Sequence, residues 1–274
     1  MANGSVRDHL STESETPLSW NTRLRVAQDA ARVLTYLHEE MEFQMIFKNF
    51  KSSNVLLDDQ WNTKLSDFGV PQILGPDGRR VTHISTKIAG FVQYAPPEYM
   101  SIGHFTSKGD VWCYGIFLYE LVTGRHPLEL ITGKNGSDWE TTSNTLNERM
   151  LLEWVKPYLG SKRFHQIIDP RLDGTHSLKS AQKLCIIANK CLSENPKSRP
   201  KMSEVLEMVN QLIRVPSQAT SLASPVVVEP KKVFVEGEKT NEGVHVHKSA
   251  CLPRIRHSKL LKPCSKKCCC VSLH

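Results

Sequence analysis

Apolar residues recur at helical spacing in several stretches of the chain. A helix is predicted to open at Leu18–Trp20 and to run to about Glu40, because an apolar stripe with spacings of three and four residues follows it. The stretch 110–121 is apolar nearly all round, so we expect it to lie buried at the centre of a helical body. Helical spacing also predicts helices over 151–155, 180–192 and 202–212. The stripe of the first helix consists of Leu24, Ala27, Ala30, Ala31, Leu34 and Leu37.

Two short apolar runs follow Asn54. Val55–Leu57 and Thr63–Leu65 flank a polar stretch, which predicts two short strands joined by a tight turn. Lys51, Asn54 and Asp67 would then lie at the ends of one hairpin, so that three polar side chains converge. An Asn and an Asp suit Mg²⁺, which takes oxygen ligands and shares them with phosphate, and a lysine suits the same phosphate.

These residues carry a resemblance to a known family. The stretch Phe47–Asn54, followed by Asp67-Phe68-Gly69, resembles the catalytic loop H-R-D-x-x-x-x-N and the D-F-G of protein kinases. The resemblance implies ATP and Mg²⁺ as cofactors, Lys51 as the loop lysine, and Asn54 and Asp67 as the Mg²⁺ ligands. Asn49 stands where the family has its catalytic Asp. An amide can hold a hydroxyl but cannot take its proton, and general-base help contributes roughly 10²–10⁴ in rate.

Residues 1 to about 214 are similar to the second lobe of plant receptor-like cytoplasmic serine/threonine kinases of subfamily VII. The resemblance implies a mainly α, protein-kinase-like fold consisting of the helical C-lobe with a small β-hairpin. In the family a phrase similar to Met1–Val6 lies just after the hinge, so the chain is expected to lack the nucleotide-binding lobe. The phrases that carry the resemblance are Phe50–Asn54, Lys64–Gly69, Thr82–Thr86, Leu151–Val155 and Ile168–Leu172.

The resemblance also assigns structural and regulatory positions. Asp110 is expected to cap the backbone of the catalytic loop, and Glu98 is expected to form an ion pair with Arg199. The long polar stretch 70–93 corresponds to the activation loop, in which Ser85 and Thr86 are the candidate phosphorylation sites.

Charge is concentrated at the C-terminal end. The net charge is +7, yet residues 250–274 contain no Asp or Glu, so the body is close to neutral and a nucleic-acid-binding body is not expected. Residues 215–249 are expected to be a disordered linker, and 250–274 a basic, cysteine-rich tail. Acylation beside lysines would give a two-signal membrane anchor; a zinc knuckle and a plain disordered end remain alternatives. The cysteines concerned are Cys264, Cys268, Cys269 and Cys270.

The absence of a secretory signal predicts a reducing compartment, in which disulfides are not expected. Cys113, Cys185 and Cys191 lie in apolar runs and are expected to be small core residues. No secretory signal and no apolar run of about 18 residues is present, so a cytoplasmic location is expected, with the inner face of the plasma membrane as a further option.

Three functional hypotheses follow. The first is a catalytically inactive kinase-like protein that binds receptor kinases or other signalling proteins of immune or growth pathways. It rests on Asn49, on the expected lack of the nucleotide-binding lobe, and on Phe91 at a position where the family has a threonine. The second is an active serine/threonine kinase whose first lobe is missing from the gene model. The third is a fragment without function, unstable because an apolar surface is exposed.

Overall fold

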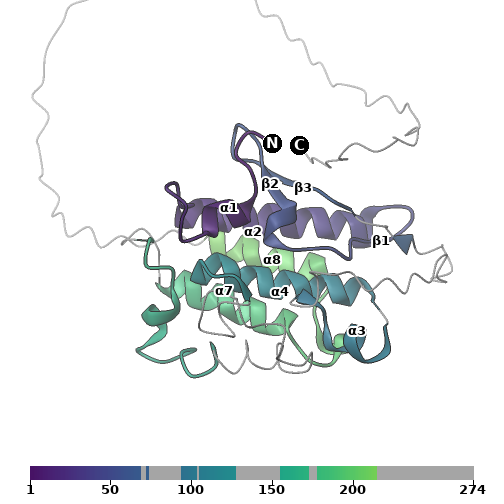
Figure 1. Ribbon diagram of the computed structural model, residues 1–274. Coiled ribbons are helices and arrows are strands. Elements are labelled where there is room, and N and C mark those ends of the chain that lie inside the picture. Colours follow the sequence, from purple (N-terminus) through teal and green to yellow (C-terminus); the bar gives the residue numbers. More distant parts are fainter. Residues whose placement is uncertain (69–71, 74–93, 104, 128–154, 173–177, 215–274) are drawn as a thin grey trace, which may run out of the picture. The chain divides into compact units, whose positions relative to one another are not determined.

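The computed structural model describes residues 1–68, 72–73, 94–103, 105–127, 155–172 and 178–214. Helices dominate this part of the chain, and the strands are short (Figure 1). The helices are α1 (Val6–Leu10), α2 (Trp20–Thr35), the π-helix η1 (Tyr36–Glu40), η2 (Ser52–Asn54), α3 (Pro97–Ile102), α4 (Ser107–Thr123), η5 (Phe164–Ile167), α7 (Leu178–Cys191), η6 (Pro196–Ser198) and α8 (Met202–Arg214). The strands are β1 (Met45–Ile46), β2 (Val55–Leu57), β3 (Thr63–Leu65) and β4 (Gln72–Ile73).

Helix α4 lies at the centre of the hydrophobic core, as its all-round apolar sequence predicted. Every residue from Gly109 to Thr123 is buried. It packs mainly against α7, while α2 packs against α8, and α7 and α8 pack against each other (Figure 1). Gly115 permits the close approach of α4 and α7, because a Cβ there would lie 2.8 Å from Leu192 Cγ and 3.1 Å from the Ala188 carbonyl oxygen. The predicted helices over 180–192 and 202–212 are present as α7 and α8.

Helix α2 begins and ends for identifiable reasons. The Ser19 side chain caps its first turn by accepting a hydrogen bond of 3.2 Å from the Thr22 N–H. The helical path continues to Glu40 as predicted, but its last turn is the π-helix η1. That wider turn carries His38, which is 5% exposed, toward the N-terminal end of α4.

The predicted hairpin is confirmed. Strands β2 and β3 pair antiparallel with Val55 opposite Leu65 and Leu57 opposite Thr63. The Asp58 carboxylate stabilises the turn by accepting hydrogen bonds from the Gln60 and Asn62 N–H groups.

Two features were not predicted from the sequence. Residues at the start of the chain pair with the free edge of β2, where Asn3 N donates to Leu57 O and Leu57 N donates to Gly4 O. Helix α1 follows, closed by a capping box between Ser5 and Asp8. Strands β1 and β4 form a second two-stranded ladder, too short to produce a visible period in the sequence.

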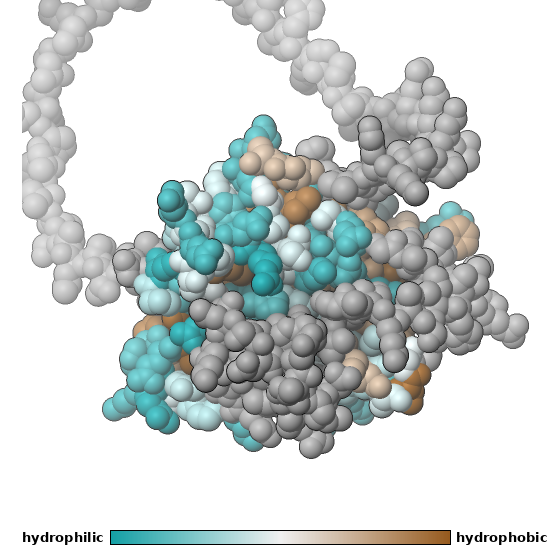
Figure 2. Space-filling model, viewed as in Figure 1, coloured by the Kyte–Doolittle hydropathy of each residue, from teal (hydrophilic) through white to brown (hydrophobic). Residues whose placement is uncertain are grey.

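The described surface is mostly polar. On the face seen in Figure 2, hydrophilic residues dominate, and apolar residues form small separate patches. Large apolar side chains that are exposed among the described residues are Met1, Phe43, Met100, Ile102, Leu178 and Ile186. The helix expected over 151–155 lies outside the described residues except for Val155, and the expected activation loop lies outside them except for Gln72 and Ile73.

Candidate functional site

The loop before β2 is fixed by one buried carboxylate. Asp110, in the first turn of α4, accepts hydrogen bonds from the Phe47 N–H at 2.7 Å and the Lys48 N–H at 2.8 Å. His38 Nε2 donates to the same carboxylate at 2.8 Å. Lys48 has a φ of 66°, a conformation costly for a residue with a Cβ. Asp110 therefore holds the loop in a defined shape, as predicted.

Asn49 and Asp67 are joined directly. The Asn49 Nδ2 donates to Asp67 Oδ2 at 2.8 Å, and Asn49 is only 7% exposed. The amide group presents its nitrogen because its oxygen would be repelled by the carboxylate. Asp67 itself is exposed and has a φ of 55°. Its carboxylate thus receives a neutral donor on one side and remains open on the other.

Asn54 ties the same loop to the hairpin. Its Nδ2 donates to the Asn49 carbonyl at 2.8 Å, and its own carbonyl accepts from the Ser66 N–H at 2.9 Å. Ser66 immediately precedes Asp67, so the loop, β2 and β3 hold the three polar residues in one cluster. The nitrogen of the Asn54 amide is used in this way, and its oxygen is the atom left for a cation.

The side chain of the loop lysine is not bonded to this cluster, although the Lys51 carbonyl accepts a hydrogen bond from the Asn54 N–H at 2.9 Å. Among the described residues, no hydrogen bond or ion pair joins the Lys51 side chain to Asn54 or Asp67, so the expected three-way convergence is reduced to Asn49, Asn54 and Asp67. Its charge acts on His126 instead: burial, followed by the charges of Arg7 and Lys51, lowers the pKa of His126 to about 3. His126 is therefore neutral at physiological pH.

A second buried carboxylate, which the sequence did not reveal, links three segments. Glu120 of α4 accepts hydrogen bonds on Oε1 from Ser52 Oγ at 2.8 Å and from Tyr94 Oη at 2.9 Å. Burial, followed by the charge of Glu120, raises the pKa of Tyr94 well above its usual value, so the phenol stays protonated and keeps donating. Ser52 follows Lys51 directly, so this network also fixes the loop.

The predicted pairing of Glu98 with Arg199 is present. Arg199 Nη1 and Nη2 donate to the two Glu98 carboxylate oxygens at 2.7 and 2.8 Å. The guanidinium also donates to the carbonyls of Ser193 and Lys108 and stacks on the Trp112 ring at 4.8 Å. In this bidentate pair the Arg199 side chain is fully buried and the Glu98 side chain is 14% exposed, and the pair connects α3 to the residue after η6.

Comparisons with known proteins match this sequence to a family. The sequence profile described as protein tyrosine and serine/threonine kinase matches residues 1–209. The chain belongs to the protein kinase family. Serine/threonine-protein kinase PCRK1 of Arabidopsis thaliana is 55% identical over 218 residues, covering 79% of this chain and 49% of that protein. PCRK2 of the same plant is 51% identical over 244 residues, covering 89% of this chain and 54% of that protein.

A third relative carries a more descriptive name. The EPD1-interacting receptor-like cytoplasmic serine/threonine-protein kinase 5D of Gossypium barbadense is 40% identical over 231 residues, covering 84% of this chain and 46% of that protein. The expected similarity to plant receptor-like cytoplasmic kinases is thus confirmed. The chain spans about half the length of the curated relatives it matches.

Protein kinases hold Mg²⁺ bound with nucleotide at the positions that Asn54 and Asp67 occupy in this chain. A carboxylate open on one side and a nearby amide oxygen are hard oxygen ligands, and they fit Mg²⁺ that completes its coordination with phosphate and water. No group of three or more His, Cys, Asp or Glu side chains among the described residues could hold a metal by itself.

Several predicted positions lie outside the residues that the structure describes. These are the candidate phosphorylation sites Ser85 and Thr86, the replaced threonine position Phe91, and the tail cysteines Cys264, Cys268, Cys269 and Cys270. Cys251 also lies outside the described residues, whereas Cys113, Cys185 and Cys191 are buried in the core as expected. None of the described helices has the length and apolarity required to cross a membrane.

Proposed function

We propose that this kinase-family chain acts by binding signalling partners and does not transfer phosphate. One observation supports the proposal above all. The residue at the position of the catalytic base is Asn49, a neutral amide whose Nδ2 donates a hydrogen bond to Asp67 Oδ2 at 2.8 Å. A base must accept the proton of the attacking hydroxyl, and an amide lacks the basicity to do so. The expected loss of transfer rate is roughly 10²–10⁴.

The same hydrogen bond is expected to lower the affinity of Asp67 for a cation. The Asn49 amide already satisfies one carboxylate oxygen, so a cation has to compete for the other atoms of the group. Asp67 and the Asn54 oxygen would hold Mg²⁺, which when bound would neutralise phosphate charge and orient a nucleotide. Binding of MgATP by this chain is therefore expected to be weak.

The biological setting is proposed from the relatives. The similar plant proteins are serine/threonine kinases, and one is named as receptor-like, cytoplasmic and interacting with EPD1. We place this chain in receptor signalling of the immune or growth type, in the cytoplasm or at the inner face of the plasma membrane. Its partners would be receptor kinases or other signalling proteins, and acylation of the cysteine-rich tail would supply the membrane attachment.

An active serine/threonine kinase is the second candidate, and the preserved architecture favours it. The Asp110 contacts to the loop backbone, the hairpin with Asn54 and Asp67, and the Glu98–Arg199 pair are all in place. This candidate predicts that a longer transcript encodes a nucleotide-binding lobe before residue 1. Sequencing the transcript upstream of the first codon tests this candidate, which is rejected if no such lobe is encoded there.

The decisive measurement is phosphate transfer from radiolabelled ATP by the purified chain, compared with Asn49→Asp and with Asn210→Asp. Asn210 is a matched control, because its Oδ1 only accepts a hydrogen bond, from Gln28 Nε2 at 2.6 Å, and a carboxylate oxygen does the same. We expect no transfer above a mock preparation for the natural chain. Transfer that depends on MgATP would overturn the proposal, both for this chain and for any longer product of the transcript.

A further inference from the structure

The exposed face of α7 carries an unusual arrangement of charge. Lys179, Lys183, Ile186 and Lys190 are all exposed, and Ile186 exposes 55% of its surface. Their spacings of four, three and four residues place them on one side of a helix. Three cations thus flank one apolar side chain along a single line, while Leu184, Cys185 and Ala188 on the opposite side are buried against the core.

No acidic residue of the same helix balances these lysines. Helix α7 contains no Asp or Glu. None of the three lysines takes part in an ion pair within the described part of the chain. The one polar contact is weak, since Lys190 Nζ lies 3.6 Å from Met208 Sδ. Exposed helices in monomers usually intersperse both signs of charge, so an uncompensated stripe points to a ligand of opposite charge.

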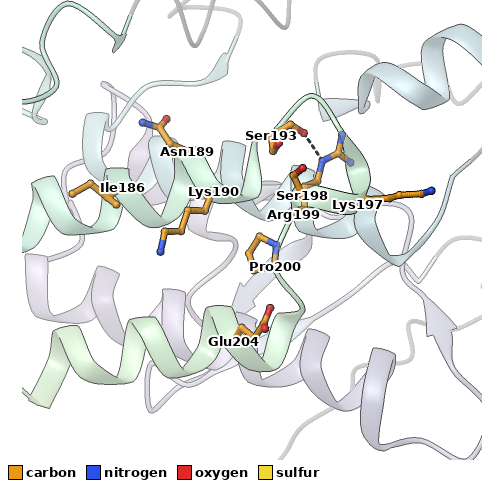
Figure 3. A pocket seen from close by; sticks show the side chains of 9 residues that line it. All are labelled: Ile186, Asn189, Lys190, Ser193, Lys197, Ser198, Arg199, Pro200 and Glu204. Carbon is orange, nitrogen blue, oxygen red and sulfur yellow. Dashed lines mark hydrogen bonds between the residues drawn. The ribbon is translucent and has the colours of Figure 1, made fainter.

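The C-terminal half of this face opens into a groove. A hollow of about 750 Å³ lies between α7, η6 and the start of α8, and both Ile186 and Lys190 line it. Figure 3 shows Lys190 and Glu204 directed into the space between α7 and α8, while the Lys197 side chain extends away from it. Glu204 is engaged locally, because its carboxylate accepts the Lys201 N–H at 2.7 Å.

We propose that this α7 face is a docking site for an acidic segment of a partner protein that carries one apolar side chain. Acidic side chains would pair with Lys179, Lys183 and Lys190, and the apolar one would cover Ile186 beside the groove. The distance from Lys179 to Lys190 along the helix is about 16 Å, which is the reach of about five residues of extended chain. Residues between the contacts would face solvent.

The shape of the site favours a polypeptide over a membrane. A lipid surface is flat and meets exposed lysines with several apolar side chains around them, whereas here a single apolar residue borders a hollow that also contains the carboxylate of Glu204. The surface belongs to α7, η6 and α8 and does not include Asn49, Asn54 or Asp67. The inference therefore stands whether or not the chain transfers phosphate.

Fluorescence anisotropy with the whole chain tests the proposal. The probe is a fluorescein-labelled peptide of about nine residues in which glutamates flank one central leucine, used beside an otherwise identical peptide with alanine. At low ionic strength, Lys179→Glu with Lys183→Glu is expected to weaken binding about tenfold, because two attractive pairs become repulsive. Ile186→Ser is expected to abolish the preference for leucine over alanine.

The control pair is Lys156→Glu with Lys162→Glu, which makes the same change of charge at two exposed lysines elsewhere on the surface. It is expected to change affinity less than about twofold, and the basic tail, present in every variant, contributes equally throughout. Thermal melts verify that all variants are folded. Equal weakening by both pairs, or no preference for leucine, would refute the docking site. The proposal would also be refuted if Lys179→Glu with Lys183→Glu left peptide binding intact but removed binding to phosphatidylserine vesicles. That result would assign the α7 face to a membrane.

Discussion

At the scale of single residues, the choice of an amide at position 49 changes the charge balance of the whole loop. Asn49 is 7% exposed, and its nitrogen satisfies a carboxylate that otherwise faces solvent. In a kinase with Asp at this position, two carboxylates lie close together, and a cation offsets their repulsion. Asn49 removes that repulsion, so the loop keeps its shape without a cation.

Replacing Asn49 by Asp is expected to make the stability of the chain depend on Mg²⁺. The new carboxylate would lie against Asp67 and repel it, which lowers the melting temperature in EDTA, by several degrees for a loss of about 1 kcal/mol. Added Mg²⁺ should restore it, while the natural chain and Asn210→Asp should show no such response. Differential scanning calorimetry with and without Mg²⁺ measures these melting temperatures. If the melting temperature of Asn49→Asp did not respond to Mg²⁺, Asp67 would not share a cation with the new carboxylate.

At the scale of elements, the apolar pattern of the sequence predicted α2, α7 and α8, which each bury one face, and α4, which is buried all round. The same pattern predicted the β2–β3 hairpin, whose two short apolar runs flank a polar turn. It did not predict α1, which is short and is held by pairing of Gly4 with Leu57. It also missed the Ser52–Glu120 hydrogen bond, which joins residues 68 positions apart. Family resemblance supplied Asp110 and the Glu98–Arg199 pair, since no local pattern marks partners so distant in sequence.

The packing of α4 on α7 depends on the absence of a side chain at Gly115. Gly115→Ala is expected to destabilise the fold by about 1–3 kcal/mol through overpacking, because the neighbouring Ala188 carbonyl belongs to the backbone and cannot rotate away. The better helix propensity of Ala offsets about 1 kcal/mol of this.

Urea unfolding of Gly115→Ala and Gly103→Ala separates crowding from backbone strain. Gly103 has a φ of 67° and nothing within 4 Å of an added Cβ, so only its conformation opposes the substitution. Equal stability of Gly115→Ala and the natural chain would mean that α4 and α7 shift apart without cost.

At the scale of the whole molecule, one buried ion pair joins segments from both ends of the described chain. Arg23 of α2 donates to Asp169 at 2.6 Å and to the Leu18 and Leu121 carbonyls, and both side chains are almost fully buried. Arg171 donates to the same carboxylate. Burial alone would raise the pKa of Asp169, but hydrogen bonds from Arg171 and the charge of Arg23 outweigh it and lower that pKa.

Because the folded-state pKa of Asp169 is depressed, its stabilising contribution is complete above the unfolded value of about 3.9 and is lost as pH falls through the folded value. Asp169→Asn is expected to cost about 3–5 kcal/mol at neutral pH, since it leaves the buried Arg23 charge without its partner. The difference should begin to narrow below the unfolded pKa of about 3.9 and should vanish only at a pH below the lowered folded-state pKa, because only there does protonation remove the same charge from the natural folded chain. Urea unfolding at both pH values measures the difference.

Asp29→Asn, which removes a partly exposed ion pair with Arg32, should stay within about 1 kcal/mol of the natural chain. A constant gap between Asp169→Asn and the natural chain at both pH values would mean that packing, and not charge, is what Asp169 contributes.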